Sequence, residues 1–442
     1  MTASRPPLAV TGIGLVTPAG HGAEPTWRGV LDARSTAAPD PALAGLPVVL
    51  SCRVPGDSAA LVGGRQPWRL DRATRFAIAA AREAVADAGL EPARWDGARV
   101  ALVLGSAAGG VGSYEHAAER LRTLGPSAVS ALALPAFLPN MAAAQLAIEL
   151  GTTGPVLHTA TACASGAAAI HTAALLLRTG ACDIALAGGT DAMITPVCVA
   201  GFARMKALSR TTDPARASRP FDADRDGFVI GEGAGFLVLE RRSDATSRQA
   251  TPRALLVGSG TAADAYHPVA PHPEARGLEA AARLALAEAG ACPDDVDHVN
   301  AHGTSTPLND SAEARLIDRL FARRPPSVTS AKGALGHTMG AAGAIEAALA
   351  VLTVQHQLVP ATAGFAVPDR DTGAIDLVHG GPRRQRLHLV LSTSAGFGGH
   401  NTALAFAPAA TPGSRHRDED AMRVAVQERA GSFGASRLTV AP

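Results

Sequence analysis

Two stretches far apart in the chain repeat one local pattern. The first has an apolar β-type run at Val156–Thr161, a turn of small residues ending at Gly166, and an Ala-rich helical run to about Arg178. The second has a β-type run at Val328–Ser330, a Gly-rich turn, and a helical run over Ala342–Val354. Alternating strands and helices predict an α/β fold, and the repetition predicts two similar halves.

Other segments extend the same alternation. The polar run Arg241–Thr251 is the expected connection, which gives an N-terminal half at 1–250 and a C-terminal half at 251–407. The remainder, 408–442, contains Pro412 and a charged run, so we expect a flexible tail. Buried strands are expected at Leu8–Ile13, Val100–Leu104, Ile184–Ala187, Gly235–Leu239, Ala254–Val257, Asp297–Asn300 and His388–Leu391, and helices at Arg72–Ala88, Gly277–Ala289 and Ser311–Arg319.

Composition excludes several classes of function. Of the 442 residues 47% are hydrophobic and 18% charged, which is typical of a folded globular chain. Lysine and arginine (40) nearly balance aspartate and glutamate (39), so net charge gives no sign of nucleic-acid binding. The five cysteines lack close metal-ligand spacing, which predicts free thiols in a reducing cytoplasm and no metal site. Neither a signal peptide nor an apolar run long enough to cross a membrane is expected.

Cys163 is the candidate nucleophile. It lies between the strand and the helix of the first repeat, where unpaired helix N–H groups favour a thiolate. We therefore expect its pKa to fall by about one unit. Ala162, Ala164 and Gly166 are small enough to let a substrate carbonyl approach. A small buried thiol at a helix start remains the alternative.

Two histidines lie at comparable positions. His302 follows a predicted strand, in Asn300-Ala301-His302-Gly303-Thr304, and strand ends of this kind carry the sites of α/β proteins. His337 lies in the Gly-rich turn of the second repeat. Together with Cys163 they form a candidate Cys-His-His set.

At these residues the chain resembles the β-ketoacyl-acyl-carrier-protein synthases, over about residues 8–407. Six motifs stand in the order typical of that family, which makes the resemblance specific. They are Val10–Gly14, the nucleophile motif Thr161–Gly166, the central signature Arg225–Gly233, the histidine motifs Asn300–Asp310 and Lys332–Gly343, and the glycine loop Gly396–Asn401.

The resemblance implies a thiolase-like fold, with duplicated halves in five alternating α and β layers, and a dimer. It also implies roles. Cys163 takes an acyl group from a carrier-bound thioester, and the backbone N–H groups of Cys163 and Phe397 form an oxyanion hole. His302 and His337 stabilise the enolate formed when malonyl thioester loses carbon dioxide. No cofactor is bound, because the substrates are carried on the phosphopantetheine of acyl carrier protein.

Further positions follow from the same resemblance. Lys332, Asp310, Glu313 and Glu346 are expected to orient the histidines, and a solvated set of charges is the alternative. Thr304 and Thr306 are expected to hold the phosphopantetheine arm. Ala108 and Phe202 are assigned to the acyl pocket, where Ala108 predicts room for medium or long chains. Ala395 replaces an aromatic residue common in relatives, which leaves the gating of the glycine loop in doubt.

Acyl carrier proteins are acidic, so a docking surface should be basic. We expect Arg65, Arg69, Lys206 and Arg210 to contribute to it, with a solvated basic face as the alternative. The partner chain is expected to be an identical subunit or a chain-length-factor-like paralogue, and neither nucleic acid nor membrane is an expected partner.

Three alternatives are open. A thiolase needs a second cysteine in the glycine loop, which has none here. A chalcone-type enzyme would have asparagine where His337 stands. A non-condensing chain-length-factor subunit typically lacks the nucleophile, whereas Cys163 is present. The motifs do not distinguish fatty-acid from specialised polyketide or polyene synthesis.

Overall fold

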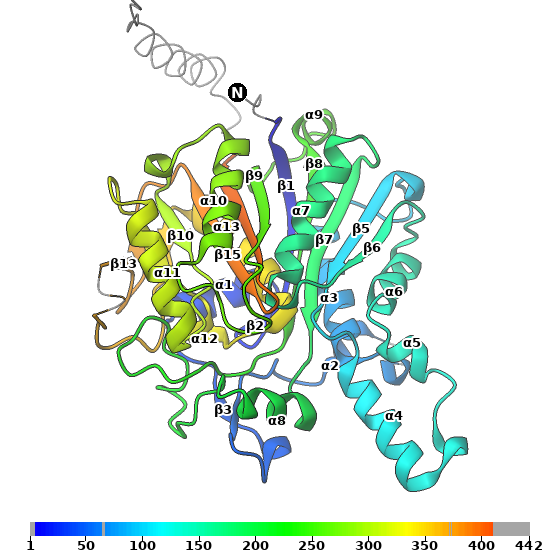
Figure 1. Ribbon diagram of the computed structural model, residues 1–442. Coiled ribbons are helices and arrows are strands. Elements are labelled where there is room, and N and C mark those ends of the chain that lie inside the picture. Colours follow the sequence, from blue (N-terminus) through cyan, green and yellow to red (C-terminus); the bar gives the residue numbers. More distant parts are fainter. Residues whose placement is uncertain (1–4, 64–66, 371, 373, 410–442) are drawn as a thin grey trace, which may run out of the picture. The chain divides into compact units, whose positions relative to one another are not determined.

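The computed structural model describes residues 5–63, 67–370, 372 and 374–409. Their strands form one twelve-stranded sheet and two small two-stranded ones (Figure 1). The N-terminal half supplies β1 (Leu8–Thr17), β5 (Val100–Gly105), β6 (Val156–Thr159), β7 (Ile184–Asp191) and β8 (Gly233–Arg241). The C-terminal half supplies β9 (Ala254–Ala263), β10 (His298–Asn300), β11 (Ser327–Thr329), β15 (Val390–Gly396) and β16 (His400–Pro408), with β13 (Asp376–Leu377) at the edge. The twelfth strand is the short β2 (Gly20–His21), which pairs with the end of β1.

The two halves have the same strand order. From the junction outward it is β1-β8-β7-β5-β6 in one half and β9-β16-β15-β10-β11 in the other. In each half the first strand is antiparallel to the last, and the second, third and fourth strands in sequence run parallel to one another. β1 pairs with β9 at the junction. This repeated topology confirms the duplicated architecture predicted from the two strand–turn–helix units.

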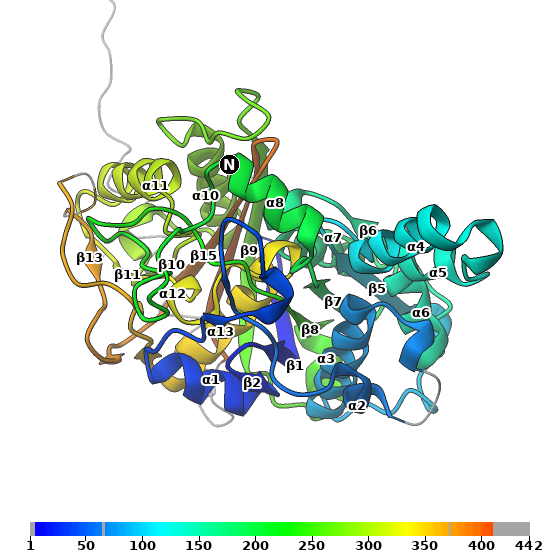
Figure 2. The ribbon, with the colours of Figure 1, turned by 90° about the horizontal axis from the view of Figure 1, so that it is seen from below.

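Helices complete five layers. α7 (Ser165–Arg178) and α13 (Ala342–His356) share a core with strands of both halves and form the middle layer. α3 (Arg72–Asp87) and α6 (Met141–Leu150) cover the outer face of the N-terminal half, while α10 (Arg276–Ala289) and α11 (Pro307–Leu320) cover that of the C-terminal half. Seen from below, α13 lies between the two sets of strands, with α3 and α11 on opposite sides (Figure 2).

Shorter elements surround these layers. α4 (Val111–Leu124) and α5 (Ala133–Phe137) project from the N-terminal half, and neither has a fully buried residue. Neither helix was predicted, although Val111, Tyr114 and Leu121 lie on one face of α4. The remaining elements are α1 (Ala23–Leu31), α2 (Ser58–Val62), α4 (Val111–Leu124), α5 (Ala133–Phe137), α8 (Pro196–Arg204), α9 (Arg242–Ser247), α12 (Lys332–Leu335), β2 (Gly20–His21), β3 (Ala38–Pro39), β4 (Leu50–Ser51), β12 (Leu358–Val359) and β14 (Arg383–Arg384).

Most expected elements are present with shifted ends. β15 begins at Val390, two residues later than expected. The strand β16 was not predicted, and its first two residues, His400 and Asn401, belong to the segment that the family resemblance assigned to the glycine loop. The division of the chain near residue 250 stays a prediction. Residues 410–442 lie outside the described part of the chain, so the predicted tail is not addressed.

Close packing of α7 against α13 holds the middle layer together. A methyl group added at Gly166 would lie 2.8 Å from the Ala344 nitrogen, and one added at Gly343 would lie 2.8 Å from Ala167 Cβ. Only small residues allow two helix backbones to come this close. Because both helices begin beside the predicted reactive turns, this contact also fixes the distance between those turns.

Gly343→Ala tests this constraint. The new methyl would overlap Ala167 and Ser394 Oγ, so we expect the free energy of unfolding to fall by about 1–3 kcal/mol. Gly201→Ala in α8 is the matched control, because nothing lies within 4 Å of a methyl group there. Urea denaturation of both variants makes the comparison, and equal stability of the two would contradict close packing at Gly343.

Candidate active site

Cys163 lies in a single 3₁₀ turn, Ala162–Ala164, between β6 and α7. The preceding Ala162 has a left-handed backbone (φ 50°), a strained conformation of the kind that clusters at functional sites. β15 passes directly against this turn, since a methyl group on Gly396 would lie 3.2 Å from the Cys163 nitrogen. The glycine therefore lets the C-terminal glycine loop reach the thiol.

The histidines approach from the C-terminal half. His302 follows β10, and Glu313 of α11 accepts hydrogen bonds from the backbone N–H groups of His302 (2.8 Å) and Gly303 (2.7 Å). His337 follows α12, and its backbone pairs with that of Val229 and Gly231 in the segment before β8. Both imidazoles are buried, each with 2% exposure.

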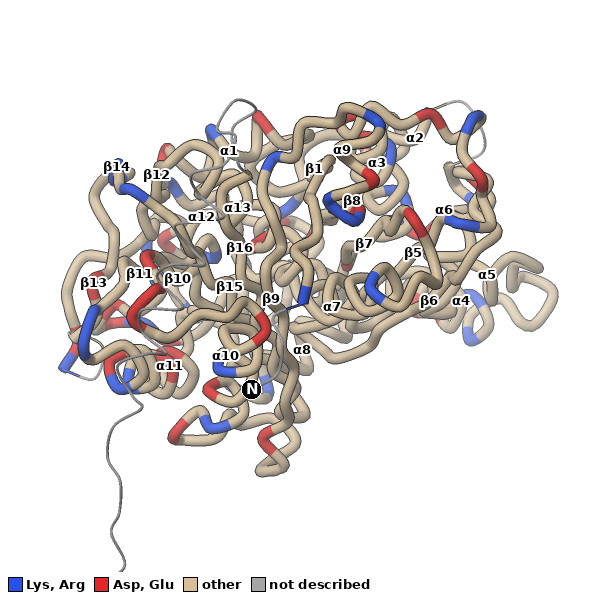
Figure 3. Tube along the Cα trace, turned by 90° about the horizontal axis from the view of Figure 1, so that it is seen from above, with Lys and Arg blue, Asp and Glu red and all other residues tan. Residues whose placement is uncertain are grey.

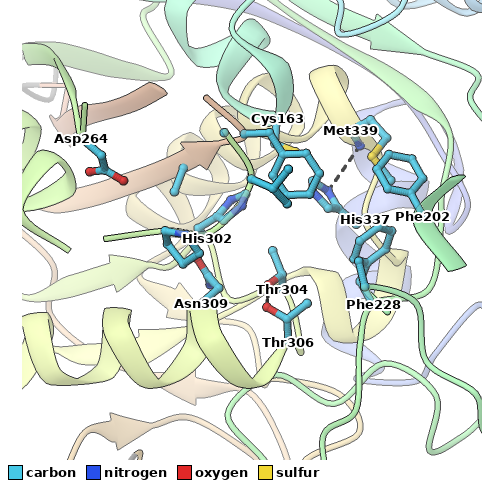
Figure 4. A pocket seen from close by; sticks show the side chains of 16 residues that line it. Cys163, Phe202, Phe228, Asp264, His302, Thr304, Thr306, Asn309, His337 and Met339 are labelled. Carbon is cyan, nitrogen blue, oxygen red and sulfur yellow. Dashed lines mark hydrogen bonds between the residues drawn. The ribbon is translucent and has the colours of Figure 1, made fainter. Parts of the chain in front are cut away.

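The three side chains line one pocket. Figure 4 shows Cys163, His302 and His337 directed toward a common space, and the two imidazole centroids are 5.5 Å apart. The enclosed cavity is small, about 80 Å³. The other lining residues include Thr304, Thr306, Phe202, Phe228, Val269, Pro271, Met339, Ala395 and Phe397.

Hydrogen bonds fix the tautomer of each ring. The Lys332 ammonium can only donate, and its Nζ lies 3.4 Å from His302 Nδ1, so that nitrogen accepts. The backbone N–H of Met339 donates to His337 Nδ1 over 3.3 Å. A neutral imidazole that accepts at Nδ1 carries its proton on Nε2. Both rings therefore offer an Nε2–H donor.

A buried charge pair supports His302. Lys332, only 1% exposed, forms an ion pair with Glu346 and donates to the His302 carbonyl over 2.6 Å. Burial raises the pKa of Glu346 to about 7, although Lys332 offsets part of the effect. A lysine held in this way fixes both the backbone and the ring of His302.

Burial dominates the protonation of the reactive groups. It lowers the pKa of His302 and of His337 well below the ordinary histidine value, and nearby Lys332 adds to the effect. Burial also raises the pKa of Cys163 to about 12, with Lys332 opposing the rise. The expected downward shift of the thiol pKa is therefore wrong, because loss of hydration outweighs the helix dipole at a fully buried sulfur. The resting site is neutral at all three side chains.

The other predicted site residues differ in whether they line the pocket. Asp310 accepts hydrogen bonds from the backbone of Phe221 (2.8 Å) and Ser305 (3.1 Å) and contacts neither imidazole. The Thr304 and Thr306 hydroxyls are 2.8 Å apart on the pocket wall. Ala108 packs with Phe202 in an apolar cluster that adjoins the pocket, since Phe202 and Met339 belong to the cluster and also line the pocket.

The predicted docking residues do not share one cleft. Arg69 is exposed and lines a groove beside α3, α4 and α5, together with Arg72 and Arg75. Lys206 and Arg210 are exposed after α8, and Ala207 between them lines the active-site pocket. Arg65 lies outside the described residues.

Asp191, at the end of β7, was not predicted from the sequence as a residue near the site. Its buried carboxylate accepts hydrogen bonds from Ser106 Oγ (2.7 Å) and from the N–H groups of Ala107 (2.9 Å) and Gly340 (2.6 Å). It thereby ties the segment leading to Ala108 to the segment that follows His337. Burial raises its pKa to about 6. An acidic residue closing the apolar run of β7 was the available signal.

Comparison with known proteins agrees with this geometry. Residues 5–245 match the model of the beta-ketoacyl synthase N-terminal domain, and residues 253–366 match that of the C-terminal domain. The chain belongs to the β-ketoacyl synthase family. The resemblance inferred from motif order is confirmed, as is the thiolase-like fold.

Individual relatives cover almost the whole chain. The chain is 38% identical to 3-oxoacyl-[acyl-carrier-protein] synthase 2 of Synechocystis sp., over 90% of this chain and 97% of that one. The solved ishigamide ketosynthase/chain length factor has a TM-score of 0.86 and 32% identity, over 92% of this chain and 100% of that one. A ketosynthase solved with its type II polyketide acyl-carrier protein gives a TM-score of 0.84 and 28% identity, over 92% and 100%.

Metal-binding clusters and membrane-spanning helices are both absent from the described residues. In that part of the chain no group of three or more His, Cys, Asp or Glu side chains could hold a metal ion. None of its helices is long and apolar enough to span a bilayer.

The raised thiol pKa predicts how Cys163 reacts. Only the thiolate is alkylated, so the rate of iodoacetamide labelling of Cys163 should rise about tenfold per pH unit from about pH 7 to about pH 9. Mass spectrometry of the Cys163 peptide over time measures this rate, with the exposed Cys292 as an internal comparison. A plateau below pH 8 would show that the thiol ionises near neutrality.

Proposed function

We propose that this β-ketoacyl synthase joins a Cys163-bound acyl group to malonyl carried on acyl carrier protein, giving 3-oxoacyl-carrier protein. The observation that carries the proposal is the shared pocket of Cys163, His302 and His337, in which both rings offer an Nε2–H donor. The names of the curated relatives support the same activity.

The first half-reaction is a thiol–thioester exchange. Cys163 Sγ attacks the acyl carbon, the bond from that carbon to the pantetheine sulfur breaks, and the thiol proton ends on the departing pantetheine. The exchange is proton-neutral overall, so it fits a site whose resting thiol is protonated. The Phe397 N–H, which already points to Cys163 sulfur, and the Cys163 N–H would hold the negative oxygen of the tetrahedral intermediate.

The second half-reaction forms an enolate from malonyl thioester and adds it to the acyl group on Cys163. Loss of carbon dioxide from malonyl thioester leaves negative charge on the thioester oxygen, and the Nε2–H groups of His302 and His337 would stabilise it. Removing one such donor typically costs about 3–4 kcal/mol of transition-state stabilisation. The carbanion carbon then attacks the acyl carbon on Cys163, and the bond from that carbon to the cysteine sulfur breaks. The sulfur leaves as a thiolate and takes up a proton from water, which restores the resting thiol. Thr304 and Thr306 would hold the pantetheine arm.

Neutral histidines suit this step better than charged ones. A protonated His302 would have no acceptor for Lys332, and two like charges would then face each other in a dry site. Lys332, Glu346 and Glu313 would act by keeping His302 in place, whereas Asp310 would position the loop through Ser305. Ala108 and Phe202 would border the acyl chain.

Carrier protein and a second subunit are the proposed partners. The ketosynthase solved with its acyl-carrier protein supports a carrier partner, and the ketosynthase/chain length factor supports a heterodimer with a chain-length-factor-like paralogue. A homodimer is the other proposed assembly. The five free cysteines support a reducing cytoplasm. The alternative, a non-condensing chain-length-factor-like subunit, is disfavoured by the presence of Cys163 together with both histidines.

Two substitutions separate the half-reactions. Cys163→Ala should abolish acyl loading and condensation, because no sulfur remains, while malonyl decarboxylation continues. His337→Ala should lower decarboxylation by about 100-fold to 1,000-fold and still allow acylation of Cys163. Intact-mass analysis of the enzyme and of carrier-bound products follows both steps. Condensation by Cys163→Ala at the wild-type rate would refute the mechanism.

Charge reversal tests carrier docking. Arg69→Glu and Lys206→Glu should each raise the apparent KM for carrier-bound substrate several-fold, since steering by an acidic partner is lost, with kcat little changed. The effect should shrink at high salt. Arg94→Glu, at an arginine 78% exposed and outside both clefts, is the control. An unchanged KM in both variants would remove these residues from the docking surface.

A further inference from the structure

Asp191 is a buried acid that takes no part in the steps proposed for Cys163 and the two histidines. It ends β7, which runs beside β5, with α3 on one side of the two strands and α7 on the other (Figure 3). The residue is 0% exposed. Its carboxylate accepts hydrogen bonds from the Ser106 hydroxyl and from the backbone N–H groups of Ala107, Ala108 and Gly340. Asp191 therefore joins three segments that are distant in the sequence.

The segment after His337 that receives this contact begins with a strained residue. Met339 opens the short turn Met339–Ala341 and has a left-handed backbone (φ 54°), although it is a buried residue with a long side chain. This conformation is unfavourable for residues other than glycine, and it persists only where surrounding contacts hold it. The shape of the turn therefore depends on what its neighbours provide.

Two backbone N–H groups at the start of this turn point away from it and need acceptors elsewhere. The Met339 N–H donates to His337 Nδ1 over 3.3 Å, and the Gly340 N–H donates to Asp191 Oδ2 over 2.6 Å. The bond to Asp191 is the shorter one and has a carboxylate acceptor, so it is the stronger of the two. Asp191 thus fixes the peptide group next to the one that contacts the imidazole.

Close packing limits where Gly340 can lie. A methyl group added at Gly340 would lie 2.4 Å from Asp191 Oδ2 and 2.5 Å from the Ala107 nitrogen. A methyl group added at Gly189 of β7 would lie 2.7 Å from the Gly340 carbonyl oxygen. The sheet therefore prevents the turn from moving inward, and the hydrogen bond to Asp191 prevents it from moving outward.

The tautomer of His337 depends on the position of this turn. A neutral imidazole donates from Nε2 only while Nδ1 acts as the acceptor, and the Met339 N–H is the donor to His337 Nδ1. If the turn relaxed, that N–H would move away and the proton could shift to Nδ1. His337 Nε2 would then present a lone pair to the thioester oxygen, which repels the negative charge of the enolate.

We propose that Asp191 is a positioning residue for decarboxylation, which holds the Gly340 peptide so that the Met339 N–H keeps the proton of His337 on Nε2. This role rests on the proposed function, since it concerns only the step in which His337 donates. Loss of Asp191 should therefore slow decarboxylation of malonyl thioester more than acylation of Cys163. An acid that served only to stabilise the fold would not distinguish the two half-reactions.

Asp191→Ala tests this role by removing the acceptor of the Gly340 N–H. Decarboxylation of malonyl-carrier protein should fall about tenfold or more, up to the loss in His337→Ala, whereas acyl loading of Cys163 should change less than about threefold. Intact-mass analysis of the carrier and of the enzyme measures the two rates. Equal loss of both rates would overturn the proposal.

Asp297→Ala is the matched control. Asp297 is also buried, and its carboxylate accepts hydrogen bonds from the backbone N–H groups of His388 (2.6 Å) and Leu389 (3.2 Å). It precedes β10, at the opposite end of that strand from His302. Its loss should lower the stability of the fold and leave the ratio of the two rates unchanged. A selective loss of decarboxylation in this control as large as that in Asp191→Ala would also overturn the proposal.

A double-mutant cycle shows whether Asp191 acts through His337. Once His337 is replaced by alanine, Asp191→Ala should have little further effect, so the double variant should decarboxylate within about twofold of His337→Ala alone. A further tenfold loss would show that Asp191 acts by another route, and the proposal would fail while the proposed function stood. Decarboxylation by His337→Ala at the wild-type rate would instead refute the proposed function, and the role of Asp191 with it.

Asp191→Asn should restore what Asp191→Ala loses. The amide oxygen can accept from the Gly340 N–H while the amide nitrogen donates to the Ser106 hydroxyl, which can also act as an acceptor. Decarboxylation should then stay within about threefold of wild type. A loss as large as that in Asp191→Ala would show that the acceptor for Gly340 is not what matters.

Gly340→Ala provides a second variant in case Asp191→Ala does not fold. The new methyl would push Gly340 away from Asp191 Oδ2 without leaving a cavity. Decarboxylation should again fall about tenfold, with acyl loading little changed. An unchanged decarboxylation rate in folded Gly340→Ala would contradict the proposed role of this contact.

Discussion

Contact between α7 and α13 in the middle layer determines where the reactive groups meet. Each helix begins immediately after one of the two turns, and Gly166, Ala167, Gly343 and Ala344 let the backbones approach. The turn at Ala162–Ala164 therefore touches the turn at Met339–Ala341. Cys163 and His337 come from different halves of the chain, and this helix contact is what brings them to one cavity.

Exclusion of water from this cavity then determines the protonation states of Cys163, His302 and His337. The thiol and both imidazoles are neutral because each is buried, and Lys332, which pairs with Glu346, is the charged group that acts on all three. In such surroundings an N–H donor interacts strongly with a charge that develops during reaction, since little solvent competes for it. The same burial makes ionisation of the Cys163 thiol unfavourable. This is consistent with transfer of an acyl group from the pantetheine sulfur to a protonated Cys163, and it is not consistent with a permanent thiolate.

The duplicated α/β architecture could be predicted from sequence because each half repeats a strand, a turn of small residues and a helix. Cys163, His302 and His337 were also predictable, since chemistry-bearing side chains at three such turns stand out against Ala-rich surroundings. The projecting helices α4 and α5 were not predicted. α5 has only five residues and contains a proline, whereas α4 has an apolar stripe at Val111, Tyr114 and Leu121 that did indicate a helix.

Two further features, the pKa shift of Cys163 and the contacts of Asp191, could not be predicted because they depend on burial and on contacts between distant segments. The direction of the Cys163 pKa shift depends on how completely the fold encloses the sulfur. Asp191 joins segments whose contact exists only after folding, through Ser106 and Gly340.

The buried pair of Lys332 and Glu346 has an evolutionary consequence. Replacing either residue alone would strand an uncompensated charge in the interior, at a cost typically about 3–5 kcal/mol, whereas replacing both by apolar residues can be nearly neutral for stability. The ancestry of such chains should therefore contain few intermediates with one partner missing. Across related sequences these two positions are expected to be kept together or lost together, and lineages that have lost both should be those in which the imidazole at position 302 is no longer needed.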